Sequence, residues 1–298
     1  MKFIGKLCLL VLLCLVLCAC AFDAQPQVAA TTMPVYCFAQ ALCEGTPISV
    51  TRLITEEVSC VHDYTLTVQQ MRAIEGAELV ILSGAGLEEF MEEALHSAAF
   101  VVDCSEGIEL LEGECHHLHG HEDAHGHEDG HAHEADPHIW LDPDNAIVMV
   151  ENICSALTAQ YPEYESIICD NATHLRRRIQ AVKDYATEAL SALSHREIIT
   201  FHDGFGYLAH AFGLEIVEAI EEESGSEPSA QELIGLILLV EHHHVSALFA
   251  ETNGSTAAAA VISAETGIPV YTLDMAMSGD SWFDAMYHNI DTLKEALG

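Results

Sequence analysis

The sequence predicts an α/β protein of two Rossmann-like lobes with parallel sheets, joined by one long rigid helix. Apolar, β-rich runs alternate with helical patterns in the first half of the chain, and the same alternation returns in the second half. An uninterrupted amphipathic stretch separates the two halves. The 298 residues are enough for two domains, since a domain has about 100 to 200 residues.

The first residues predict an exported, lipid-anchored protein. Residues 1–19 combine a positively charged start with an apolar stretch too short to span a membrane, the pattern of a signal peptide. Small Ala19 directly precedes Cys20, an order that resembles the bacterial lipobox, in which the cysteine after the cut receives a lipid. We therefore expect a lipid on Cys20 and a tether over residues 20–27, with ordinary cleavage around Ala21 as the alternative.

Residues 28–160 are predicted to form the N-terminal lobe. Apolar runs alternate there with helical patterns, a βαβ rhythm that gives a parallel sheet covered by helices. The expected strands cover residues 28–36, 48–54, 78–82 and 100–104. The expected helices include residues 67–75 and 87–96.

Residues 161–193 are predicted to form the connecting helix. The stretch has no Gly or Pro after Pro162, and apolar residues recur at steps of three and four, as on one face of a helix. At about 1.5 Å per residue, the helix would be roughly 45 to 50 Å long. A coiled-coil dimer would show the same stripe, but the flanking sheets favour a single helix packed on both lobes.

Residues 194–298 repeat the alternation and predict the C-terminal lobe. Ser229 and Glu232, spaced S-x-x-E before apolar residues, predict a capping box at the start of a covering helix. The expected strands of this lobe cover residues 198–201, 215–219, 246–250 and 270–273.

The whole chain is expected to be a monomer.

The composition excludes several classes of function. The chain has 47 Asp and Glu against 10 Lys and Arg, a formal net charge of −37, although half of its residues are hydrophobic. Such a charge repels nucleic acid and anionic lipid headgroups, so cations are the expected partners. The sequence has no nucleophile elbow and no convincing pair of acid and base residues, and we therefore expect no enzyme.

Residues 116–133 break the pattern with a run of histidines, glycines and acidic residues. The segment has almost no apolar side chains to bury, so we expect a mobile loop. Imidazoles at this density bind divalent transition metals weakly, and the alternative is a solvated low-complexity insertion. The auxiliary metal-binding candidates are His116, His117, His119, His121, His125, His127, His131 and His133.

Four side chains are candidates for a specific metal site because of their places along the chain. His62 comes after the second predicted strand in the sequence, and His138 lies in a loop that comes after the fourth predicted strand. In the second lobe, His202 closes one strand and Asp274 closes the last. Open α/β sheets bind ligands beyond the carboxyl ends of their strands. Two side chains from each lobe would put the metal between the lobes.

The cysteines leave two interpretations open. Of the 11 cysteines, an odd number remains once the four up to Cys20 are set aside, so they cannot all pair within the chain. Cys154 and Cys169 are placed to bridge two antiparallel helices, because an exported chain permits disulfides. Without paired C-x-x-C spacing, the alternative is that the cysteines are mostly small buried hydrophobic residues.

The chain resembles a family, the zinc- and manganese-binding solute-binding lipoproteins of bacterial ABC importers. The resemblance covers essentially the whole mature chain and rests on six motifs in the family's order. They are H-D-Y from His62, S-G-A-G-L-E from Ser83, D-P-H-I-W-L-D-P from Asp136, H-D-G-F-G-Y from His202, E-P-S-A from Glu227 and L-D from Leu273.

This resemblance implies an extracytoplasmic protein, anchored to the cell membrane as a lipoprotein, that delivers its metal to an ABC permease. It also implies two α/β lobes joined by a rigid helix. The family's metal ligands match His62, His138, His202 and Asp274. Met275 stands where the family usually has Pro, so Glu251 or a water is the alternative fourth ligand.

Zinc is the metal that these residues favour. Three imidazoles suit tetrahedral Zn²⁺, whereas a carboxylate in place of His202 would favour Mn²⁺. The expected function is therefore high-affinity capture of Zn²⁺ between the lobes and its delivery to the permease. The alternatives are a manganese-binding member of the same family, a surface adhesin or metal buffer, and a zinc hydrolase.

Overall fold

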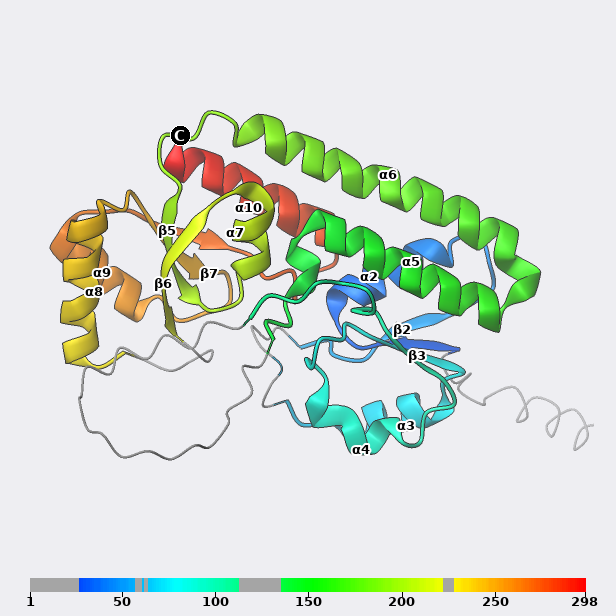
Figure 1. The fold of residues 1–298 in the computed structure, drawn as a ribbon. Helices are drawn as coiled ribbons and strands as arrows, with labels where there is room; N and C mark the ends of the chain where they lie inside the picture. Colours follow the sequence, from blue (N-terminus) through cyan, green and yellow to red (C-terminus); the bar gives the residue numbers. More distant parts are fainter. Residues whose placement is uncertain (1–26, 57–60, 62–63, 113–134, 222–227) are drawn as a thin grey trace, which may run out of the picture.

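The structure is a computed structural model that describes residues 27–56, 61, 64–112, 135–221 and 228–298. It has two parallel four-stranded sheets with helices around them, as the sequence predicts (Figure 1). Within the described part, no helix is both long and apolar enough to cross a membrane.

The first sheet has the strand order β2-β1-β3-β4, and every pair in it is parallel. Its strands are short, with three or four residues each. They are β1 (Val28–Ala30), β2 (Val50–Arg52), β3 (Leu79–Leu82) and β4 (Val101–Asp103).

The predicted strand over residues 28–36 is wrong beyond Ala30. A helix, α2 (Met33–Leu42), begins three residues later, with Pro34 in its first turn. Proline lacks the N–H that a sheet ladder needs, whereas its fixed φ suits the start of a helix. The strand expected over 48–54 is shortened to β2 at both ends.

Four further helical segments accompany the first sheet. The predicted helix over 67–75 is confirmed as α3 (Val68–Gly76), and a capping box of Thr67 and Gln70 opens it. The predicted helix over 87–96 is reduced to a 3-10 turn, η1 (Glu89–Met91), and a single turn, α4 (Glu92–Leu95). Another helix, α5 (Pro143–Gln160), is capped by Asp142, which accepts from the Asp144 N–H.

The second sheet has the order β6-β5-β7-β8, again all parallel. The capping box of Ser229 and Glu232 is confirmed at the start of α8. The strands are β5 (Glu197–His202), β6 (Glu215–Glu221), β7 (Leu248–Glu251) and β8 (Val270–Leu273). The helices of this half are α7 (Gly206–Phe212), α8 (Ala230–His243), α9 (Ala257–Thr266) and α10 (Trp282–Leu297).

The connecting helix is shorter than the predicted 161–193. It is α6 (Glu165–Ala189), 25 residues or about 37 Å. Pro162 lies in a separate 3-10 turn, η3 (Pro162–Tyr164). At the other end, the Ser191 hydroxyl donates to the Glu188 carbonyl oxygen, a side-chain bond that competes with continued helix.

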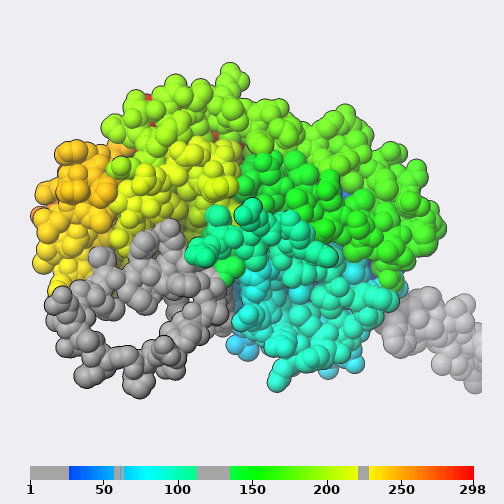
Figure 2. Space-filling view, in the orientation of Figure 1, coloured from blue at the N-terminus to red at the C-terminus, as the bar shows by residue number. Residues whose placement is uncertain are grey.

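Helix α6 packs on both halves of the molecule. It contacts α2 and α5 on one side and α10 on the other, and its apolar stripe is buried along its whole length. Figure 2 shows the green helical layer lying over the cyan part and the yellow part alike. The largest hydrophobic cluster among the described residues accordingly contains side chains from both sheets, such as Ile81 and Phe249.

Two buried tryptophans join the halves by hydrogen bonds. The Trp140 indole Nε1 donates to the Met275 carbonyl oxygen at 2.7 Å, and the Trp282 indole Nε1 donates to the Trp140 carbonyl oxygen at 2.9 Å. Both side chains are fully buried. Arg52 on β2 adds a third contact by donating to the carbonyl oxygens of Met277 and Gly279. The two halves therefore share polar contacts as well as a core.

A buried carboxylate ties together the ends of β1 and β3. Glu88 accepts from the Thr31 hydroxyl at 2.6 Å, from the Ser83 N–H at 2.7 Å and from the Gly84 N–H at 3.0 Å. Burial raises the pKa of Glu88 to about 7, although these hydrogen bonds lower it. A proton is therefore bound more tightly by Glu88 in the folded chain than in the unfolded one.

Replacing Trp282 with Phe should lower the free energy of unfolding by about 2 kcal/mol or more. The substitution leaves the buried Trp140 oxygen without the indole donor and also reduces the volume of the ring. Urea unfolding followed by circular dichroism measures the change. Tyr287→Phe, at a more exposed ring of the same helix, is the control, and an equal loss in both variants would contradict the expectation.

Replacing Glu88 with Gln should change how stability depends on pH. The folded pKa of about 7 lies above the usual pKa of 4.5 for a glutamate side chain, so the stabilisation from protonated Glu88 is lost as pH rises from about 4.5 to 7. The free energy of unfolding of the native chain should therefore fall relative to the variant by up to about 3 kcal/mol over this range. Urea unfolding at pH 5 and pH 8 measures the difference, with Glu89→Gln as control. A difference that does not change with pH would refute the expectation.

Candidate metal centre

His138 lies directly before a 3-10 turn, η2 (Ile139–Leu141), that leads into α5. Its side chain is buried, with 2% of the residue exposed. One oxygen of Asp136, Oδ1, accepts from the His138 backbone N–H at 2.9 Å and lies 2.8 Å from the ring Nδ1. When Nδ1 donates its proton to this carboxylate, Nε2 carries none and can bind a metal.

His202 is the last residue of β5 and is also buried. Its ring centroid lies 5.2 Å from that of His138, and the two rings are nearly perpendicular, at 86°. One ring comes from the loop before α5 and the other from the end of a strand in the second sheet. The structure thus brings together two of the four predicted side chains, one from each half.

Two glycines of the H-D-G-F-G motif allow this close approach. A Cβ at Gly204 would lie 2.6 Å from the His202 ring and 2.7 Å from the Met275 methyl carbon. A Cβ at Gly206 would lie 2.8 Å from Oδ2 of Asp136. Any larger residue at either position would push against a side chain of the candidate site.

The two candidate carboxylates lie at the ends of neighbouring strands. Glu251 ends β7, and Leu273 is its register partner on β8, so Asp274 comes one residue later. On the other side, Thr200 pairs with Phe249. Extending this register by two residues places Glu251 level with His202. Because register partners point to the same face of a sheet, Glu251 and His202 share a face.

Asp274 is held by its backbone and its own turn. The buried Asn289 of α10 accepts from the Asp274 N–H at 2.7 Å and donates to the Asp274 carbonyl oxygen at 2.8 Å. The carboxylate oxygen Oδ1 accepts from the Ala276 N–H at 2.8 Å. Part of the acceptor capacity of this carboxylate is therefore already used within the turn.

Several predicted residues lie outside the described part of the chain. They are His62, the histidines of 116–133 and Cys20. Among the residues that the structure does describe, no three His, Cys, Asp or Glu side chains gather closely enough to hold a metal ion. His62, the third predicted imidazole, is not among these residues.

Sequence reasoning left the roles of some neighbouring residues open or missed them. From the sequence, Asp136 and Asp142 could either orient His138 or only shape its loop; in the structure Asp136 contacts the ring, whereas Asp142 caps α5. The D-P-H sequence, in which Asp136 comes two residues before His138, was the available signal for this contact. Asn289 and Trp282 were missed, because no local pattern connects α10 with residues 15 and 142 positions away.

Comparison with known proteins identifies the family. Residues 28–296 match the model of a family described as zinc-uptake complex component A, periplasmic. The chain is 32% identical to the high-affinity zinc uptake system protein ZnuA of Bacillus subtilis, over 79% of this chain and 77% of that protein. It is 29% identical to a putative metal-binding protein of Treponema pallidum, over 93% and 92% of the two chains.

Solved structures agree with the sequence comparison. A crystal structure of ZnuA superposes with a TM-score of 0.77 at 27% identity, covering 91% of this chain and 99% of the other. The chain spans about half the length of the streptococcal zinc-binding AdcA proteins that it matches, 56% of each. The match to the family model over nearly all of the described chain shows that this protein belongs to the family of periplasmic zinc-uptake components, ZnuA.

Proposed function

We propose that this chain captures Zn²⁺ between its two lobes with high affinity and delivers it to a membrane permease of the ABC type. The observation that carries the proposal is the pair of buried imidazoles, His138 and His202, whose ring centroids lie 5.2 Å apart. Two rings from separate halves of the chain that meet in this way can bind one ion from two sides. Membership of the zinc-uptake family supports zinc as that ion.

His62 is proposed as the third imidazole. In the sequence it comes after β2, which ends at Arg52, and belongs to the half of the chain that also carries His138. Three neutral imidazoles and one carboxylate make a four-coordinate set that suits Zn²⁺. The same set is less suited to Mn²⁺, which prefers oxygen ligands.

Glu251 and Asp274 are the two proposals for the carboxylate. The register supports Glu251, because it lies level with His202 on the neighbouring strand. Asp274 is supported by the resemblance of its L-D motif, although Ala276 already uses one of its oxygens. Substitution of each carboxylate in turn separates the two.

The charge of the chain supports a cation as its cargo. A formal net charge of −37 gives a negative potential around the molecule that raises the local concentration of divalent cations and speeds their association. The same charge disfavours anionic partners. We propose no catalytic role for the site.

The proposed location is outside the cytoplasm, with Cys20 carrying a lipid that anchors the chain to the membrane. The S. pneumoniae relative is named a zinc-binding lipoprotein, which supports an anchor of this kind. One lipid chain anchors a protein only weakly, so a diacylated cysteine gives the more stable attachment.

His202→Ala and His138→Ala should each abolish the tight binding of one Zn²⁺ per chain. Each substitution removes one of the two buried imidazoles that meet between the lobes, and the remaining ligands cannot replace it. Deletion of residues 116–133 should leave this site intact and remove only weakly bound zinc. Calorimetric titration of purified protein, with metal analysis after dialysis, measures both.

His210→Ala, at an exposed position on α7, is the matched histidine control. In the same titration, Glu251→Gln and Asp274→Asn are compared, and the larger loss identifies the carboxylate ligand. If the His202→Ala variant still binds one Zn²⁺ tightly per chain, the proposed site is contradicted.

Asp136→Asn should weaken zinc binding by about 10- to 100-fold. Asparagine cannot accept from both the His138 backbone and its ring with the strength of a carboxylate, so the ring is less firmly oriented. Competition with a zinc-specific chelator measures the dissociation constant. Asp144→Asn, at an exposed position of α5, is the control, and equal affinities in all three proteins would show that Asp136 does not position the ring.

A further inference from the structure

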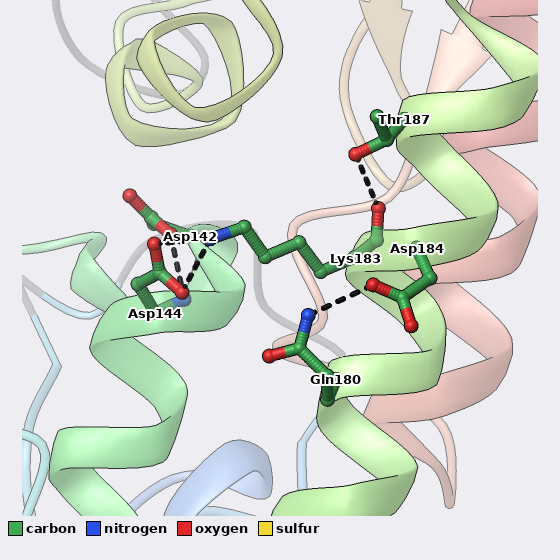
Figure 3. Close-up of polar contacts among 6 residues, drawn as sticks. All are labelled: Asp142, Asp144, Gln180, Lys183, Asp184 and Thr187. Atoms are coloured by element: carbon green, nitrogen blue, oxygen red, sulfur yellow. Dashed lines mark hydrogen bonds and ion pairs between the residues drawn. The ribbon is translucent and has the colours of Figure 1, made fainter.

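Helices α5 and α6 lie side by side and antiparallel, and ion pairs follow one edge of their contact. Lys183 on α6 donates to both carboxylate oxygens of Asp144 on α5, at 2.8 and 2.6 Å (Figure 3). Farther along, Arg176 donates to Glu151 at 3.0 Å. Seven residues forward on α5 correspond to seven residues backward on α6, which is the register of an antiparallel helix pair.

Two cysteines lie farther along the same two helices, within one helical turn of this register. Cys154 lies one helical turn beyond Glu151 on α5, and Cys169 lies two turns before Arg176 on α6. The two side chains lie close enough to interact. Cys154 is partly buried against the core, whereas Cys169 is exposed to solvent. The pair therefore combines mutual contact with access for a reagent from outside.

We propose that Cys154 and Cys169 form a disulfide bond that cross-links α5 to α6. The inference rests on the proposed location outside the cytoplasm, where disulfides form and persist. Other cysteines of the described chain are less suited, because Cys43 and Cys104 are buried and the Cys37 sulfur contacts the thioether of Met33.

The oxidant is a disulfide-bonded thiol compound of that compartment, and the exchange is balanced. The Cys169 thiolate attacks one sulfur of the oxidant, breaks its S–S bond and releases the first thiol. The Cys154 sulfur, having lost its proton to solvent, then attacks the Cys169 sulfur and releases the second thiol. The chain loses two electrons and two protons, and the oxidant gains both.

The environment of the pair sets the order of these steps. Burial, with a smaller contribution from neighbouring Cys169, raises the pKa of Cys154 to about 11. Because the thiolate is the attacking species, the exposed Cys169 meets the oxidant first and Cys154 closes the bond. The cross-link would fix α5, which begins five residues after His138, to the helix that joins the lobes.

The test uses the purified full chain, reduced and then exposed to oxidised glutathione. After alkylation and digestion without reductant by a protease that cleaves after Glu, which cuts at Glu163 and Glu165 between the two cysteines, the peptides with Cys154 and Cys169 should be found joined, with both cysteines protected from alkylation. Reduction should lower the Tm of the oxidised protein by roughly 5 to 10 °C, because the bond closes a short loop of the unfolded chain.

Cys154→Ser and Cys169→Ser should each abolish the cross-link and this Tm difference, whereas Cys37→Ser should keep both. Alkylation of both cysteines after oxidation, or separate glutathione adducts on them, would overturn the proposal. Zinc stoichiometry measured on the same samples distinguishes failure of the disulfide proposal from failure of the proposed zinc-binding function. One tight zinc without a cross-link refutes only the disulfide, and a cross-link without tight zinc refutes only the proposed function.

Discussion

The candidate site depends on one hydrogen bond between the halves of the molecule. The Trp140 indole donates to the carbonyl oxygen of Met275 at 2.7 Å, and this bond joins the loop of His138 directly to the loop of Asp274. It is fully buried, where an unmade hydrogen bond would cost about 1 to 3 kcal/mol. Trp282 holds the same Trp140 from its other side. The positions of the two loops are therefore set together rather than separately.

A shared core makes this arrangement stiff. The cluster that contains the buried stripe of α6 also contains strand residues of both sheets, so the lobes cannot separate without exposing apolar surface. Flexible hinged strands would permit wide opening, but a packed helix permits little. Exchange of a bound ion is then expected to depend on local changes near the site or on the membrane partner.

The sequence predicts the fold well because buried parallel strands appear in it as runs of apolar residues between helical patterns. Its main error, the strand over residues 28–36, arises because a three-residue strand and an apolar helix follow each other there with only Thr31 and Thr32 between them, and threonine is common in strands. The long helix is predicted correctly, but its length is not. Pro162 and Ser191 lie beside its two ends, and the spacing of apolar residues does not show where a helix begins or ends.

The candidate site is predictable only where it follows from topology. His138 and His202 could be placed in one site because they come from strand ends and the adjoining loops, and such ends meet at one edge of a sheet. The choice between Glu251 and Asp274 depends on register, which the sequence does not contain. The contacts of Trp282 and Asn289 depend on how α10 packs, and this is a property of the folded core.

The bonds of Asp136 have a consequence for the thermodynamics of metal capture. A single carboxylate oxygen fixes both the backbone and the ring of His138, so this ligand has little rotational freedom to lose when an ion arrives. Its contribution to affinity is then expected to be mainly enthalpic. The same rigidity means that the ring cannot swing away to let the ion go, and dissociation would have to begin at another ligand.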